Sequence, residues 1–136
     1  MRPIDSLKAV AAALLALAAN LALTTLAISV YAWVIAPGHP GAFYQAMAPR
    51  IAMWSAPPGG FLVLLLAAYV LGRRRPPRKA IAFAIALGLA YVALDAVSGT
   101  ASAGTGAILN PMYALSMALA LAGALAGGAL AARRNA

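Results

Sequence analysis

Charged side chains are confined to a few short segments of this 136-residue chain. The sequence contains no Asp, Glu, Lys or Arg from Ala9 to Pro49, from Ile51 to Gly72 or from Ala96 to Ala132. A helix needs roughly 20 apolar residues to cross the hydrocarbon core of a bilayer, which is about 30 Å thick. Each run is long enough to cross at least once, so the sequence predicts an integral membrane protein.

The apolar runs divide into four predicted transmembrane helices, with approximate ranges 7–35, 51–71, 79–97 and 111–132. Because 65% of the residues are hydrophobic and 9% are charged, little chain remains for a soluble domain. We therefore expect an all-α membrane protein, a four-transmembrane-helix bundle in which residues 1–136 form a single transmembrane domain. The first apolar run is longer than the core of a typical signal peptide, which favours a retained helix over cleavage.

The basic residues predict how these helices are oriented. Nine of the ten lie on one side of the predicted bundle: Arg2, Lys8, Arg73, Arg74, Arg75, Arg78, Lys79, Arg133 and Arg134. Because Lys and Arg beside membrane spans stay in the cytoplasm, both termini and the loop 73–79 are expected there, with Arg50 on the opposite side. The basic loop is expected to contact anionic lipids, whereas nucleic acid is not an expected partner. The high Ala, Gly and Arg content favours a bacterial inner membrane.

The composition also limits the chemistry that the chain can perform. The sequence has no cysteine, one histidine and two acidic residues. Thiolate metal sites and thiol catalysis are therefore excluded. General acid and base catalysis needs paired groups, and the two acids lie on opposite sides of the predicted membrane. We expect no enzyme, no metal and no cofactor, and we interpret His39 as an ordinary loop residue among turn formers.

Small and polar residues at helical spacing predict which helix faces pack together. In the first helix, Asn20 and Thr24 share a face with small alanines and can hydrogen-bond to a neighbouring helix. In the third helix, Gly88 shares a face with Asp95, which is the only acidic residue inside a predicted span. In the fourth helix, Gly123 and Gly127 form a GxxxG pattern, which is typical of close helix contact within a chain or between two copies.

The residues between the third and fourth helices predict a loop and a helix start. The uncharged stretch 98–106 is rich in Ser, Thr, Ala and Gly, and we expect an exposed linker there. Asn110 followed by Pro111 is a favoured arrangement for the N-cap and first position of a helix.

The second predicted helix contains the sequence Pro57-Pro58-Gly59-Gly60. Prolines remove backbone donors and glycines add backbone freedom, so the helix should be broken. Two arrangements remain open. Either a kinked helix begins near Pro49, or a short helix on the outer surface precedes a half-length one.

The break predicts a site in the outer half of the membrane. At 1.5 Å per residue, Gly59 and Asp95 lie at similar heights above the basic loop. Broken helices and intramembrane acids often mark binding sites, and an ion pair between Asp95 and Arg50 is expected. The candidate ligand or ion site comprises Asp95, Arg50, Trp54, Ser55, Gly59 and Tyr91.

These features favour a small non-catalytic membrane protein, either an accessory or assembly subunit or a protein that binds a lipid or a protein partner. The alternative is a homo-oligomeric transporter or channel for a small solute or ion, which would use Asp95 near the break in the second helix. A continuous wet path through these residues would favour transport, whereas a closed and packed cluster would favour the accessory role.

Overall fold

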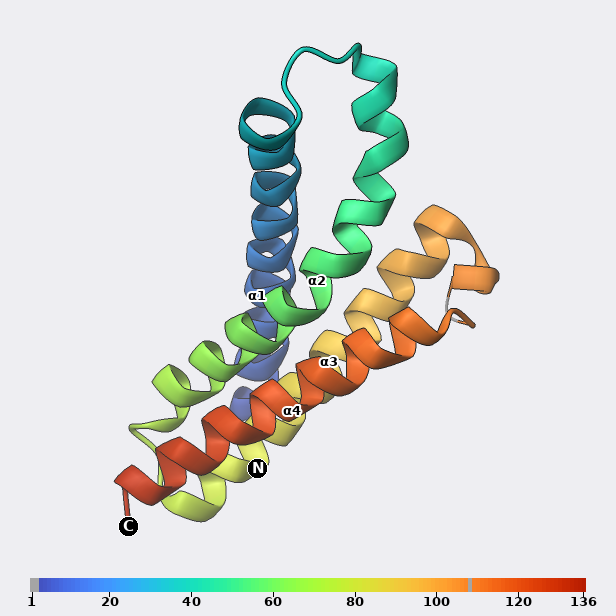
Figure 1. Cartoon of the computed structure of the whole chain (residues 1–136). Helices are drawn as coiled ribbons and strands as arrows, with labels where there is room; N and C mark the ends of the chain where they lie inside the picture. Colours follow the sequence, from blue (N-terminus) through green and yellow to red (C-terminus); the bar gives the residue numbers. More distant parts are fainter. Residues whose placement is uncertain (1–2, 108) are drawn as a thin grey trace.

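The computed structural model describes residues 3–107 and 109–136, so Arg2 lies outside the described residues. The elements in order are α1 (Pro3–Val30), a π-helical turn η1 (Tyr31–Ile35), α2 (Gly41–Gly72), α3 (Pro77–Ala103), a 3-10 turn η2 (Thr105–Ala107) and α4 (Pro111–Arg134) (Figure 1). Each of the four α-helices is long and apolar enough to cross a membrane. The predicted all-α, four-helix architecture is confirmed, and it indicates an integral membrane protein.

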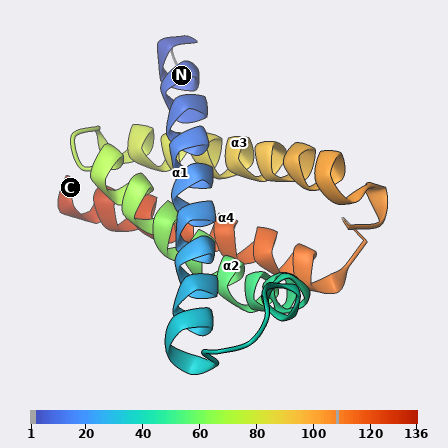
Figure 2. The same cartoon turned by 90° about the horizontal axis from the view of Figure 1, so that it is seen from above.

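The four helices do not form a bundle of parallel rods. Figure 2 shows α1 lying across the layer formed by α3, α4 and the second half of α2. The buried face of α1 is the predicted one, because Ala9, Ala13, Ala16 and Asn20 are all at most 7% exposed. Their small side chains let α1 approach two helices that run in another direction.

The second helix begins ten residues earlier than predicted and is continuous. It runs for 32 residues from Gly41 and contains Pro49, Pro57 and Pro58. A proline inside a helix removes one backbone hydrogen bond and clashes with the preceding turn, so the helix bends without ending. Figure 1 shows the change of direction near the middle of α2. Of the two arrangements left open by the sequence, the kinked helix is therefore the observed one.

The prediction of an exposed linker at 98–106 was wrong for residues 98–103, because α3 continues to Ala103. The hydroxyl groups explain why a stretch rich in Ser and Thr remains helical. Thr100 Oγ1 donates to the Ala96 carbonyl and Ser102 Oγ donates to the Ser98 carbonyl, each at a distance of 2.8 Å. Each bond satisfies a polar side chain within its own helix. Asn110 then caps α4 as predicted, with Oδ1 accepting from the Met112 N–H at 2.9 Å.

Helices α2 and α4 pack with almost no space between their backbones. A Cβ atom on Gly123 would overlap the Phe61 carbonyl oxygen, and one on Gly127 would overlap the Leu65 carbonyl oxygen. The GxxxG face therefore meets α2 of the same chain. Beside it, a cluster of alanines surrounds Leu64 and other fully buried side chains.

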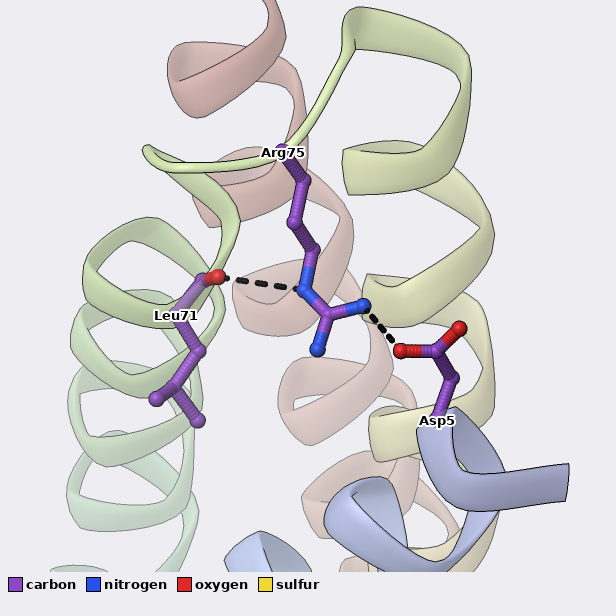
Figure 3. A network of polar contacts seen from close by, with 3 residues as sticks. All are labelled: Asp5, Leu71 and Arg75. Atoms are coloured by element: carbon purple, nitrogen blue, oxygen red, sulfur yellow. Dashed lines mark hydrogen bonds and ion pairs between the residues drawn. The ribbon is translucent and has the colours of Figure 1, made fainter. Parts of the chain in front are cut away.

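The two described ends of the chain and the α2–α3 turn gather at one end of the molecule (Figure 1). Arg75 Nη1 forms an ion pair with Asp5 Oδ1 at 2.8 Å, while its Nε donates to the Leu71 carbonyl at 3.3 Å (Figure 3). The guanidinium also lies 4.1 Å from the centre of the Phe83 ring. Asn135 Nδ2 donates to the Gly72 and Arg75 carbonyls, at 3.2 and 2.7 Å. We call this region the basic end, and the opposite one the distal end.

The loop at the distal end is held by a single tyrosine. Tyr44 Oη donates to the Ala36 carbonyl at 2.7 Å and accepts from the His39 N–H at 3.1 Å. The His39 ring stacks on Phe43, with ring centres 4.2 Å apart. These contacts join the π-helical turn η1 to the start of α2.

Candidate functional site

The bend in α2 leaves its first half flanked by two hollows. On one side is a cavity of about 390 Å³, which we call the Asp95 cavity. On the other side, between α2 and the second half of α1, is a more open groove of about 730 Å³, which we call the Arg50 groove. Residues of α2 face the two hollows alternately, because Pro49, Ala52 and Met53 lie on one face of the helix and Arg50 and Trp54 on another.

The Asp95 cavity receives polar side chains from three helices and one helix cap. These are Asn20 of α1, Asp95 of α3, Tyr113 and Ser116 of α4, and the cap residue Asn110. The rest of the lining is apolar and consists of Pro49, Ala52, Met53, Ala56, Pro57 and Met112. No Lys or Arg lines the cavity, so the Asp95 carboxylate has no basic neighbour there.

Two buried polar atoms in this cavity lack a well-formed hydrogen bond within the described residues. The first is Oδ1 of Asn20, a residue that is 7% exposed. The second is Oη of Tyr113, which interacts with the nearby Asp95 carboxylate without reaching strict hydrogen-bond geometry. Buried polar atoms almost always have a protein or solvent partner. Two of the three buried polar atoms without a well-formed partner in the described residues therefore belong to side chains that line this cavity.

The inner end of the cavity is closed by a contact between α1, α2 and α3. Asn20 Nδ2 donates to Tyr91 Oη at 2.8 Å. The pair fits because α2 has glycine at this level: a Cβ on Gly59 would overlap Asn20 Oδ1, and one on Gly60 would lie 3.4 Å from Tyr91 Oη. Toward the basic end, the interior is filled by buried side chains such as Leu87. Among the described residues, this packed interior lies between the cavity and the basic end.

The Arg50 groove is mainly apolar, and two of its polar residues, Arg50 and Ser55, lack partners among the described residues. Its walls come from α1 and η1 between Leu23 and Ile35 and from α2 between Met47 and Ser55. Arg50 forms no hydrogen bond or ion pair with any described residue. The Ser55 hydroxyl is buried and also lacks a partner.

The Ser55 hydroxyl is both buried and without a partner among the described residues. Thr25, Ser29, Thr100 and Ser102 each donate to the carbonyl four residues earlier, with distances of 2.8 to 2.9 Å. Such a bond satisfies a hydroxyl in an apolar helix without outside help. Because Ser55 makes none, a small movement of its side chain is enough to offer the hydroxyl to a molecule in the groove.

The structure divides the six residues that the sequence grouped into one site. Asp95 lines the cavity, whereas Arg50, Trp54 and Ser55 line the groove on the other side of α2. Gly59 and Tyr91 lie at the closed inner end, around Asn20. The expected ion pair between Asp95 and Arg50 was wrong, because the acidic partner that the structure pairs with an arginine is Asp5, at the basic end.

The predicted packing residues have different surroundings. Thr24 is half-buried and makes no side-chain hydrogen bond to a described residue. Gly88 meets α4, where an added Cβ would lie 3.1 Å from a Leu121 methyl carbon and 3.2 Å from Ala124 Cβ. The sequence interpretation assigned Asn20 to packing and missed its place in the cavity.

Tyr113 and Ser116 were not predicted as site residues, although their spacing contains a usable pattern. They lie three residues apart and continue, toward the C-terminus, into the face that carries Ala120 and Gly123. That face packs into the molecule. Polar residues at the start of a buried helix face are therefore candidates for a site lining.

Comparison of the chain with known protein families, curated proteins and solved structures finds no match.

Proposed function

We propose that this is a non-catalytic membrane protein that binds a phospholipid in the Arg50 groove, in the manner of an accessory or lipid-binding subunit. The observation that carries the proposal is an unpaired arginine at the edge of an apolar groove. An anionic phosphate complements the charge of Arg50, and acyl chains complement the aliphatic walls. None of the described residues forms an ion pair or hydrogen bond with Arg50.

The position of Ser55 supports a phospholipid over a free phosphate. Ser55 lies five positions after Arg50 in α2, which corresponds to about 7.5 Å along the helix axis. A phosphate at Arg50 would therefore place the glycerol and its ester carbonyls near Ser55, whose hydroxyl has no partner in the protein. The same arrangement places the acyl chains along Leu23 and Leu26 of α1.

The distribution of basic residues supports an orientation with both termini in the cytoplasm of a bacterial cell, and the groove in the outer leaflet of the inner membrane. Exposed basic residues at the basic end, including Arg73, Arg74 and Arg78, then face the cytoplasm and anionic lipid there. Because the chain has no native cysteine, single cysteines at Gly38 and Arg74 can be labelled in intact cells with an impermeant maleimide. Labelling at Gly38 and protection at Arg74 are expected, and the reverse pattern would contradict this orientation.

Lipid binding is tested by native mass spectrometry of protein extracted gently from its own membrane. We expect one retained phospholipid per chain, and loss of most of it in Arg50→Gln. Arg74→Gln removes an exposed arginine at the basic end and is the matched control, so it should retain the lipid. Equal retention by the two variants would refute a phosphate site at Arg50. A stoichiometric partner protein in the same spectra would instead identify an assembly subunit.

A homo-oligomeric transporter is the second candidate, and the presence of a carboxylate beside a bent helix favours it. The packed layer around Asn20 and Tyr91 argues against conduction through one chain. Flux measurements in proteoliposomes distinguish the two functions. Transport that is lost in Asp95→Asn would favour the transporter over the binding protein.

A further inference from the structure

The Asp95 cavity has the composition of a binding site that is separate from the Arg50 groove. It places one carboxylate among the amide and hydroxyl groups of Asn, Tyr and Ser, and no Lys, Arg or His is among its described lining residues. Its volume of about 390 Å³ lies within the range of small-ligand sites. Its lining therefore specifies both the charge and the size of a ligand.

The acceptor with the strongest claim on a ligand in this cavity is the Asp95 carboxylate, which has no basic neighbour in the lining. The backbone adds a second acceptor, because Pro57 has no N–H and cannot donate to the Met53 carbonyl four residues earlier. Both Met53 and Pro57 line the cavity. These two acceptors favour a ligand that donates hydrogen bonds or carries positive charge.

A metal ion held directly by side chains fits this cavity less well than an organic cation. Hard cations take six or more oxygen ligands at short distances. Within the described residues, no three His, Asp or Glu side chains form such a group. The cavity wall instead offers Met53, Met112 and Ala52 to an apolar ligand body, and the Tyr113 ring to a cationic nitrogen.

We propose that the Asp95 cavity binds a small organic cation, a protonated or quaternary amine whose nitrogen lies beside the Asp95 carboxylate. The hydrocarbon part of the ligand packs against the α2 wall. Asn20 and Tyr91 close the side of the cavity that faces the packed interior, so the ligand enters and leaves on another side. This site is independent of the phospholipid proposed for the Arg50 groove, which lies across α2.

The test uses the full-length protein in nanodiscs, with benzylammonium as the probe and benzyl alcohol as its neutral analogue. Isothermal titration calorimetry should show benzylammonium binding at least tenfold more tightly than the alcohol. In Asp95→Asn, which keeps the side-chain shape, we expect a 10- to 100-fold loss for the cation and little change for the alcohol. These ranges correspond to the contribution of a hydrogen bond to a charged group, about 1.5–3 kcal/mol.

A second pair of variants keeps the proposal testable if Asp95→Asn fails to fold. Ala52→Phe fills the cavity from the α2 wall and should abolish cation binding. Ala46→Phe adds the same ring to an exposed position of α2 that lines neither hollow, and it should bind like the unmodified protein. Equal affinity for the cation and the alcohol, or binding that survives Ala52→Phe, would overturn the proposal.

The outcome is separable from that of the lipid experiment. Arg50→Gln should leave benzylammonium affinity within about twofold of the unmodified protein, because Arg50 lies outside the cavity. Loss of cation binding in this variant would contradict the assignment of the ligand to the Asp95 cavity.

Discussion

Replacing Gly59 with alanine tests the contact that closes the Asp95 cavity. The new methyl group would overlap Asn20 Oδ1, so Asn20 would have to rotate and its bond to Tyr91 would break. Breaking this hydrogen bond leaves the Asn20 amide and the Tyr91 hydroxyl buried and unpaired, which lowers the free energy of unfolding by roughly 1–3 kcal/mol. Keeping the bond and straining the helices apart has a similar cost, about 1–3 kcal/mol. Whichever response is cheaper, the methyl group should be unfavourable.

The adjacent Gly60 supplies the matched control. A Cβ at Gly60 would lie 3.4 Å from Tyr91 Oη and 3.5 Å from Asn20 Nδ2, which are ordinary contact distances. Both glycines are buried in α2, so the gain of about 1 kcal/mol in helix propensity is common to both variants. We therefore expect Gly59→Ala to be less stable than Gly60→Ala by roughly 1–3 kcal/mol. The free energies of unfolding are measured by SDS titration in mixed micelles, followed by circular dichroism.

A double-mutant cycle identifies the cause of the difference. Asn20→Ala removes the oxygen that blocks the methyl group, so Gly59→Ala introduced into that variant should no longer be destabilising. Equal stability of the Gly59→Ala and Gly60→Ala proteins would refute the argument that Asn20 is fixed. A cost at Gly59 that persists without Asn20 would assign the effect to the backbone of α2.

Two further predictions concern the remaining helix contacts, and the same unfolding titration measures both. Gly127→Ala would place a methyl group against the Leu65 carbonyl oxygen, which belongs to a helix backbone and cannot rotate away, so a loss of roughly 2–3 kcal/mol is expected. Gly41→Ala, whose methyl group would meet nothing within 4 Å, should cost nothing. Arg75→Gln removes an ion pair and a ring contact and should cost roughly 1–2 kcal/mol, against less than about 0.5 for the exposed Arg74→Gln. Either prediction is wrong if its control loses as much stability.

The helices could be predicted from the sequence because the controlling features are local. Long runs without charge require helices in a membrane, whatever their neighbours are. The spacing of Ala9, Ala13, Ala16 and Asn20 identified the buried face of α1, since side chains three and four residues apart share a face. Asn110 was recognised as an N-cap for an equally local reason.

The start of α2 could not be predicted in the same way. Pro49 is a helix breaker in water, and the sequence interpretation placed the boundary beside it. In an apolar environment, helical structure is retained around prolines, because ending the helix would leave more backbone groups unsatisfied. The helix therefore continues back to Gly41 and bends at its prolines.

Counting residues along the helices also could not predict that the candidate site is divided between two hollows. The number of residues from the basic loop gives depth in the membrane, and depth placed Asp95 and Arg50 close together. It does not give direction around the helix axis. Arg50 and its neighbour Pro49 have nearly equal depth, yet they face different hollows. Tyr113 was missed for a related reason, since only the packing of α3 against α4 brings it to Asp95.

The first half of α2 is a partition with a different chemical compartment on each side. One face supplies Ala52 and Met53 to the Asp95 cavity, and the other supplies Ile51 and Trp54 to the Arg50 groove. Any movement of the partition toward one compartment enlarges the other. Occupants that displace it in opposite directions must weaken each other's binding by the same factor, because linkage is reciprocal. Coupling between the acidic and the apolar compartment is therefore confined to occupants that displace this helix.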